Sequence, residues 1–302
     1  MKKSIKLILI IAVILLVVSI SGCILSVTLL KGGNSDKTVS TLGYGELADP
    51  TELSNEEKFA GYASVLDYGA KPDDNVDDTS AFETAIKKNI AVYAPAGKYN
   101  VSRPLPFNDQ NFFGDGENAT VIVSNMTDKT KPIIYIGGSS NIYDMSIEYA
   151  AEAVDGKEKK GERVAVMCGA AVGMGPGGGI KDVTFRNVGT AVYSDALDGY
   201  GSQNSAFERI IIENFAFSGF DFNCKAGYGN YFSQIIAKNS KGTGVFTFTG
   251  SGGTDVLENI TVENCRLEYA IGYTELAGVT VSNPIYLESE FSKSELFIIK
   301  TE

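Results

Sequence analysis

The sequence contains no histidine, and this absence removes several kinds of chemistry at once. Without imidazole there can be no Ser-His-Asp triad, no histidine general base and no histidine-ligated metal. Acid–base chemistry must therefore come from carboxylates, Lys, Arg or Tyr. Positive charge is also scarce, because 26 Lys and Arg accompany 37 Asp and Glu, a formal net charge of −11. This balance disfavours nucleic acid, and a polyanionic polysaccharide would be repelled overall unless calcium or a local basic groove intervened.

Helical periods are also few in the 302 residues, which argues against an α/β barrel. A hydrophobic content of 44% and 33 glycines allow a large core with many turns. Once the N-terminal segments described next are set aside, we expect one elongated domain over residues 61–302.

The N-terminal segment, residues 1–30, has early lysines followed by an unbroken apolar run over Leu7–Val18, which is typical of a secretion or anchoring segment. Small residues before Cys23 fit a lipoprotein signal, with a thioether lipid on that cysteine. Alternatively, Ile5–Leu30 is long enough to cross a bilayer as a helix. Both alternatives tether the body to the outer face of the cell membrane. Residues 31–60 are polar and aperiodic, and we interpret them as a flexible linker.

A helix followed only by strands is predicted after this linker. Oxygens of Asp77, Asp78 and Thr79 can accept from the free N–H groups of a helix start, and apolar residues then recur at helical spacing over 79–88. A short strand over 90–93, a turn and a second strand start at Lys98 follow.

The motifs in this stretch resemble the N-terminal signature of the pectate-lyase superfamily, which includes rhamnogalacturonase-like and phage-tailspike-like domains. The resemblance rests on Gly69-Ala-Lys-Pro-Asp73, Asp77-Asp-Thr79 and Val92-Tyr-Ala-Pro-Ala-Gly-Lys-Tyr99, although residue 74, usually Gly, is Asp. It implies an all-β fold, a single-stranded right-handed parallel β-helix whose N-terminal end is capped by the short helix. The two aspartates are then helix caps rather than catalysts.

An internal repeat supports a solenoid independently of this resemblance. The unit apolar–x–apolar–x–Asn recurs five times, ending at Asn187, Asn214, Asn239, Asn264 and Asn283. Successive asparagines are 27, 25, 25 and 19 residues apart, a period typical of stacked coils. Because Asn tolerates left-handed backbone and its amide can bond to its neighbour one coil away, we expect these five to form one ladder.

The remaining segments follow from alternation and composition. Second strands such as Gly219–Cys224 should point Phe220, Phe222 and Cys224 inward and Asp221, Asn223 and Lys225 outward. We expect residues 150–179 to leave the coils as a long loop. The simpler interpretation of Cys224 and Cys265 is that both are interior residues, and a disulfide between them is the alternative. The strand-like end lacks a cap, so a loop or another subunit, for example in a homotrimer, should cover it.

Candidate catalytic residues are outward charged groups in neighbouring coils, namely Asp195, Asp198, Asp221 and Lys225, with Arg186, Glu213 and Tyr228 nearby. Two carboxylates about 5–10 Å apart would hydrolyse a glycosidic bond. A lyase would need a cationic base such as Lys225 or Arg186, and often a carboxylate-bound Ca²⁺; the metal ligands are unknown.

The Asn-Thr-Asp, Gly-Asp-Asp, Gly-His-Gly and Arg-Ile-Lys motifs of polygalacturonase-type members are absent. Two functions therefore remain open for this tethered extracellular protein. One is a glycoside hydrolase or polysaccharide lyase, and the other is a non-catalytic surface protein that binds glycans, mediates adhesion or builds the envelope.

Overall fold

The structure is a computed structural model, and it describes residues 61–150, 155–169, 178–196, 202–224, 229–249, 252–274 and 277–299. The predicted anchor, the lipid site Cys23 and most of the linker lie outside these residues. Within them, no helix combines the length and the apolar character that a membrane crossing requires.

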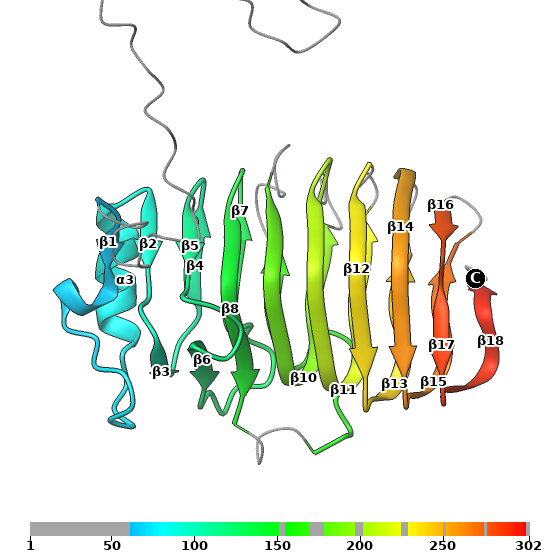
Figure 1. Cartoon of the computed structure of the whole chain (residues 1–302), viewed down its shortest axis with the longest axis horizontal. Helices are drawn as coiled ribbons and strands as arrows, with labels where there is room; N and C mark the ends of the chain where they lie inside the picture. The colour runs from blue at the N-terminus through cyan, green and yellow to red at the C-terminus, as the bar shows by residue number, and fades with distance from the viewer. Residues whose placement is uncertain are drawn as a thin grey trace, which may run out of the picture. The chain divides into compact units, whose positions relative to one another are not determined.

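The described chain contains two short helices and many strands (Figure 1). The helices are η1 (Val65–Tyr68), a 3₁₀ turn, and α3 (Thr79–Lys88). The first nine strands are β1 (Ala63–Ser64), β2 (Ala91–Tyr93), β3 (Gly97–Val101), β4 (Leu105–Asn108), β5 (Asn111–Phe113), β6 (Thr120–Ser124), β7 (Ile134–Gly137), β8 (Asn141–Tyr149) and β9 (Val164–Cys168). The others are β10 (Gly179–Ala196), β11 (Ala206–Cys224), β12 (Tyr231–Lys238), β13 (Lys241–Phe248), β14 (Gly252–Glu263), β15 (Arg266–Tyr273), β16 (Ala277–Ser282), β17 (Ile285–Leu287) and β18 (Glu290–Ile298).

Each strand pairs in parallel with a strand one coil away, so the chain winds as a parallel β-solenoid. One strip runs β2–β5–β8–β10–β11–β12–β14 and ends on β16 and β17. A second strip runs β4–β7–β9–β10–β11–β13–β15–β18. The long strands β10 and β11 contribute to both. Figure 1 shows the coils following one another in chain order from β1 to β18.

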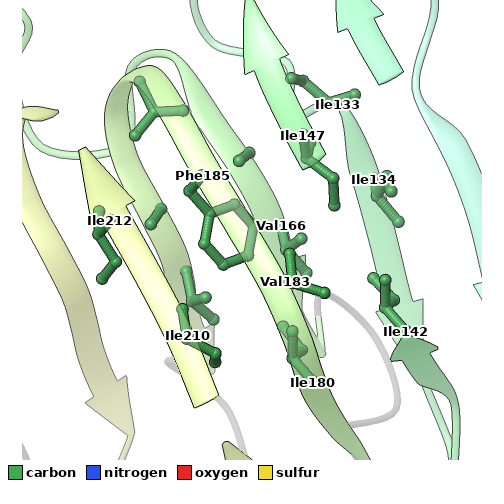
Figure 2. Close-up of a cluster of buried hydrophobic side chains, with 14 of the residues drawn as sticks. Ile133, Ile134, Ile142, Ile147, Val166, Ile180, Val183, Phe185, Ile210 and Ile212 are labelled. Carbon is green, nitrogen blue, oxygen red and sulfur yellow. The ribbon is translucent and has the colours of Figure 1, made fainter. Parts of the chain in front are cut away.

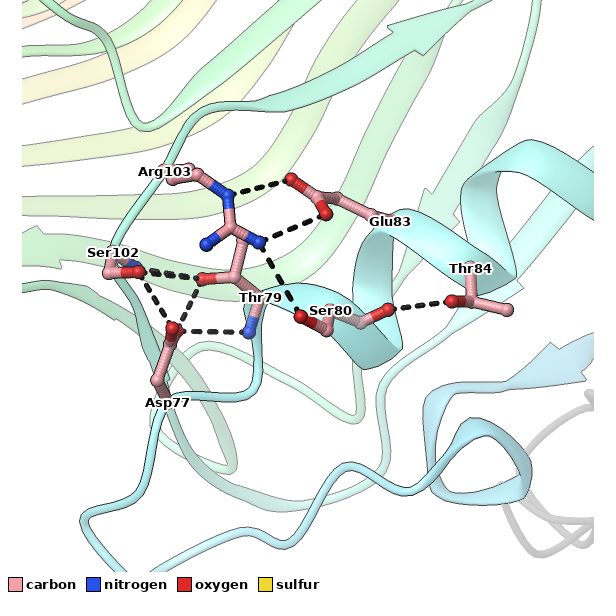
Figure 3. Close-up of polar contacts among 7 residues, drawn as sticks. All are labelled: Asp77, Thr79, Ser80, Glu83, Thr84, Ser102 and Arg103. Carbon is pink, nitrogen blue, oxygen red and sulfur yellow. Dashed lines mark hydrogen bonds and ion pairs between the residues drawn. The ribbon is translucent and has the colours of Figure 1, made fainter.

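Helix α3 begins at Thr79, as the sequence predicts, and packs over the first coils. The Thr79 N–H donates to Asp77 Oδ1 at 3.1 Å, and the Ser102 hydroxyl donates to Asp77 Oδ2 at 2.7 Å (Figure 3). Asp78 is the N-cap residue, but its side chain accepts no hydrogen bond from the helix N–H groups, contrary to expectation. Its carboxylate instead accepts from the N–H groups of Lys71 (2.8 Å) and Asn100 (3.2 Å), because it is turned towards the first coils.

The core is a column of aliphatic and aromatic side chains that point inward from every strip. Figure 2 shows part of it, with Val183, Phe185, Ile210 and Ile212 from β10 and β11 meeting at the centre. Further along, Phe220 stacks on Phe246 with ring centroids 5.0 Å apart. The inward placement of Phe220 and Phe222 is confirmed, at 0% and 4% exposure.

The turns form two columns of left-handed residues rather than one ladder. The first contains Asp144, Asp182, Arg209, Gln234, Asn259 and Asn283, with φ between 51° and 57°. The second contains Asn187, Asn214, Asn239, Asn264 and Glu288, with φ between 48° and 57°. The assignment of Asn283 to the second column was therefore wrong. Its amide donates to Asn259 Oδ1 at 3.3 Å, and Glu288 occupies the position above Asn264.

Three other expectations concern these coils. The span 150–179 is not one long loop, because β9 lies inside it and pairs with β7 and β10. Cys265 is a free buried thiol, so the disulfide alternative is wrong, while the Cys224 side chain lies outside the described residues. In the described part of the last coil, Leu296 and Ile298 of β18 are about half exposed, at 51% and 46%. What covers it stays a prediction.

Candidate functional site

The outer surface of the β4–β7–β9–β10–β11–β13–β15–β18 strip, which we call the site face, carries one row of side chains in register. Its members, one from each successive strand, are Pro106, Tyr135, Met167, Tyr193, Asp221, Thr247, Gly272 and Phe297. Neighbouring strands lie about 4.8 Å apart, so the row places aromatic, acidic and hydroxyl groups at short intervals along the solenoid. Tyr193, Asp221 and Thr247, in the middle of the row, are 6%, 1% and 6% exposed, so other groups cover them.

Asp221 is the unusual member of this row, since an outward carboxylate should be exposed. Only 1% of its surface is accessible. The loop of residues 155–163, which we call the strap, covers it and brings Lys160 Nζ to 3.3 Å from Asp221 Oδ1. The same ammonium lies 5.9 Å from the ring centroid of Tyr193. Carboxylates buried beside a cation occur at functional sites and in structural ion pairs alike.

Backbone bonds and buried charges hold the strap in place. The Arg163 N–H donates to Lys129 O at 2.7 Å, and the Gly189 N–H donates to Arg163 O at 2.9 Å. Glu158 is buried, and its Oε1 accepts from the Asp155 N–H at 3.0 Å. The strap is therefore part of the folded structure, and its Lys160 side chain, 40% exposed, forms the solvent side of the Asp221 site.

Tyr269 forms the opposite wall of the site. Its hydroxyl lies 3.2 Å from Thr247 Oγ1, and its ring stacks on Phe297 with centroids 5.6 Å apart. The ring fits because two neighbours are glycines: a Cβ on Gly244 or Gly272 would lie 2.3 or 2.5 Å from it. Burial raises the pKa of the Tyr269 phenol, and the charge of Asp221 raises it further. Tyr269 is thus a neutral hydrogen-bond donor at physiological pH.

An open cleft of about 390 Å³ lies at the earlier end of the site face. Tyr135 contributes one wall, and the other lining residues are Ser102, Arg103, Pro104, Met126, Thr127, Asp128 and Lys131. Tyr135 is two strands before Tyr193 in the register row, a separation of about 10 Å. The site face therefore offers a hollow as well as the Asp221 site.

Comparison with known proteins agrees with this architecture. Residues 62–285 match the model of the family described as "Rhamnogalacturonase A/epimerase, pectate lyase-like". The chain belongs to this family. The resemblance inferred from the N-terminal motifs is thereby confirmed, and the match extends over most of the described coils of this pectate-lyase-like protein. No curated protein matches the chain.

Three solved structures share the fold of this pectate-lyase-like chain. The catalytic domain of a GH87 α-1,3-glucanase in complex with nigerose has 17% identity and a TM-score of 0.53, covering 73% of this chain and 41% of that one. The Agl-KA catalytic domain has 12% identity and a TM-score of 0.51, covering 77% and 58%. The pre-mature bacteriophage phi29 gene product 12 has 17% identity and a TM-score of 0.52, covering 75% and 33%. The chain thus spans between a third and three-fifths of their lengths.

Of the residues predicted to be catalytic, Asp221 lies on the site face. Asp195 is in β10, two residues after Tyr193 and paired with Asn223, but its side chain is outside the described part. Asp198, Lys225 and Tyr228 also lie outside it. Their grouping with Asp221 stays a prediction.

Arg186 and Glu213 do not join Asp221. They belong to the first strip, in a register row of charges that contains Glu148, Arg186, Glu213, Lys238 and Glu263. Arg186 Nε lies 3.8 Å from Glu213 Oε2, and Lys238 Nζ lies 3.9 Å from the same oxygen. The charges in this row therefore alternate in sign, and two ion pairs join Glu213 to its neighbours on a surface separate from the site face.

Lys160, Tyr193 and Tyr269 were missed by the sequence interpretation. Tyr193 could have been found, because alternation with the inward-facing Val192 gives it an outward position. Lys160 could not, since nothing local indicates that a strap residue crosses to β11. Among the described residues, no three acidic or cysteine side chains converge as a metal site would require, and calcium binding stays a prediction.

Proposed function

We propose that the protein is a polysaccharide-active enzyme that binds a glycan along the site face and uses Asp221 as its acid–base or nucleophilic carboxylate. The observation that carries this proposal is the burial of Asp221 at an outward register position, between Tyr193 and Thr247 and beneath Lys160. A buried carboxylate at an outward position with a cationic neighbour is a candidate for acid–base or nucleophilic chemistry.

Two tyrosines adjoin Asp221. Tyr193 and Tyr269 are 6% and 3% exposed, so a sugar could stack on either ring only after the groups that cover it move aside. The hydroxyl of Tyr269, kept neutral by burial, lies 3.2 Å from Thr247 Oγ1, so it could donate to a substrate oxygen only in place of that contact. Hydrolysis would also need a second carboxylate, for which Asp195 and Asp198 are the candidates; elimination would use a cationic base, for which Lys225 is the candidate.

A non-catalytic glycan-binding protein is the second candidate. It is favoured by one observation: in the described side chains of the register row, Asp221 is the one carboxylate. In that case the pair of Asp221 and Lys160 would only fix the strap.

Activity on a panel of neutral and acidic polysaccharides, with and without calcium, tests both candidates. Released reducing ends would report hydrolysis, an unsaturated product would report elimination, and proton spectra would report epimerisation. We expect Asp221→Asn to lower the rate by about 10²–10⁴-fold, the size usual for one acid–base group. The control Glu263→Gln removes one negative charge from the first strip and should leave the rate unchanged.

The outcomes separate the candidates. If no polysaccharide yields a product but one still binds, and Asp221→Asn weakens that binding, the protein is a glycan-binding protein and not an enzyme. If neither turnover nor binding depends on Asp221, both candidate functions are wrong.

We also propose that residues 1–30 tether this body to the outer face of the membrane, through a lipid on Cys23 or through a spanning helix. The support is the apolar run of the sequence. Cys23→Ser followed by membrane fractionation separates the two: release from membranes indicates the lipid, and retention indicates the helix. A wild-type protein found free of membranes would contradict tethering.

A further inference from the structure

Two lysines on the site face each contact a carboxylate and an aromatic ring, although the Asp221 side chain is 1% exposed and the Glu268 side chain 44%. Lys160 Nζ lies 3.3 Å from Asp221 Oδ1 and 5.9 Å from the Tyr193 ring centroid. Lys293 Nζ lies 2.7 Å from Glu268 Oε2 and 4.7 Å from the Phe297 ring centroid. Each ammonium therefore sits between a carboxylate and an aromatic ring, the combination that attracts an alkylammonium group most strongly.

The two environments belong to one surface. Asp221 and Phe297 are members of the same register row, three strands apart, which corresponds to about 14 Å. The second ammonium also lies 6.0 Å from the ring of Tyr269, the residue that walls the Asp221 site. The site face thus repeats an ammonium-binding arrangement along the direction in which a polymer would lie.

Both lysines approach from the solvent side. Their side chains are 40% and 44% exposed, whereas the Asp221 side chain beneath Lys160 is 1% exposed. A lysine that is half in solvent can swing away at small cost, because its stem is flexible and its charge is readily hydrated. Asp221 is fixed in the sheet by comparison.

We propose that the site face binds a polysaccharide that carries free protonated amines, an amino-sugar polymer in its de-N-acetylated form, and that Lys160 and Lys293 hold the positions of two such amines when no ligand is bound. The inference rests on the proposed function and names the substrate class of the same site. A chain with a net charge of −11 would attract such a cationic polymer over a distance, whereas it would repel a polyanion.

The role of Lys160 distinguishes this proposal from recognition of an acidic sugar. If Lys160 stands in for a ligand amine, it competes with the ligand, and Lys160→Gln should tighten binding. If Lys160 instead contacts a ligand carboxylate, the same substitution should weaken binding. An amine ligand and a carboxylate ligand thus predict opposite effects of Lys160→Gln on the binding affinity.

Binding of the full-length protein to three probes tests the proposal by calorimetry: a glucosamine oligomer, the N-acetylated oligomer of equal length, and an oligogalacturonate. We expect the glucosamine oligomer to bind best, with an affinity that falls as salt rises. Asp221→Asn should weaken it at least 10-fold, since it removes a charge-assisted hydrogen bond. Lys160→Gln should strengthen it severalfold, and the matched strap substitution Lys159→Gln should leave it unchanged.

Glu263→Gln controls for the loss of one negative charge, and thermal unfolding of each variant controls for folding. Tighter binding by Lys160→Gln could not arise from a misfolded protein. Preference for the N-acetylated oligomer or for oligogalacturonate, or weaker glucosamine binding by Lys160→Gln, would overturn the inference. If the N-acetylated oligomer or the oligogalacturonate binds and Asp221→Asn weakens that binding, the proposed function survives. If no polysaccharide binds in a way that depends on Asp221, the proposed function fails as well.

Discussion

Lys160 Nζ lies 3.3 Å from Asp221 Oδ1, and this contact joins the strap to the sheet at the candidate site. The pair is asymmetric, with a buried carboxylate and a lysine that is 40% exposed. Water screens the lysine, so the pair should contribute less than a fully buried one.

A double-mutant cycle on this pair is the first prediction. We expect Lys160→Gln to lower the free energy of unfolding by about 1–2 kcal/mol in the wild-type background and by clearly less when Asp221→Asn is already present. Urea denaturation of the four proteins measures the coupling. Strictly additive effects would show that the two side chains do not interact in solution.

Asp255 should make the fold less stable at neutral pH than at mildly acidic pH. It is 7% exposed, its Oδ1 accepts from the Asn230 N–H at 2.8 Å, and burial raises its pKa to about 6 from 3.8. A raised pKa means that the folded state binds the proton more tightly than the unfolded chain. The resulting stabilisation is complete below about pH 4 and is lost as pH rises through about 6.

Asp255→Asn should therefore raise the free energy of unfolding at pH 7.5 by up to about 3 kcal/mol, the equivalent of two pKa units, and by little at pH 4. The asparagine keeps the acceptor oxygen that Asn230 needs. Urea unfolding at the two pH values measures the difference, with Glu263→Gln as an exposed control. An equal effect at both pH values would mean that ionisation of Asp255 is not the cause.

The turn columns predict a difference between two substitutions of Asn214. Its φ is 57°, and its Nδ2 donates to Asn187 Oδ1 at 2.6 Å. Asn214→Ala loses the amide and leaves a residue that tolerates left-handed backbone less well than asparagine, which should lower stability by about 1–2 kcal/mol. Asn214→Gly also loses the amide, but glycine adopts this backbone freely, so the loss should be smaller. Equal losses in thermal unfolding would show that the backbone conformation is unimportant there.

Gly272→Ala should disturb the site without disrupting the core. Its new Cβ would lie 2.5 Å from the Tyr269 ring, so the ring must move away from Thr247 or Phe297. We expect glycan binding to fall by about 10-fold, the effect of losing roughly one aromatic contact of 1.4 kcal/mol, while the circular dichroism spectrum stays that of the wild type. Unchanged binding would remove Tyr269 from the site.

The solenoid was predictable because its signals are local and repeated. The inward phase of Phe220 follows from alternation alone, and the start of α3 at Thr79 follows from capping chemistry. The error at Asn283 has a visible cause. The spacing between successive asparagines, near 25 residues along the ladder, fell to 19 at this position. The shorter spacing marked a change from one turn column to the other.

The site was less predictable because it is assembled between coils. Asp221 could be placed on an outer surface by alternation, but its burial depends on a strap whose Lys160 is contributed from an earlier coil. The same limit explains Arg186 and Glu213, which look like free charges in the sequence. Their partners, including Lys238, are one coil away and become visible only when the strands are in register.

The position of a bound oligosaccharide in an experimental structure tests the central claim most directly. A crystal of the protein with a glycan that binds in solution should show the sugar on the site face, with a ring against Tyr193 or Tyr269 and a hydrogen bond to Asp221. A sugar bound on the first strip, over the row that contains Arg186 and Glu213, with the site face empty, would contradict it.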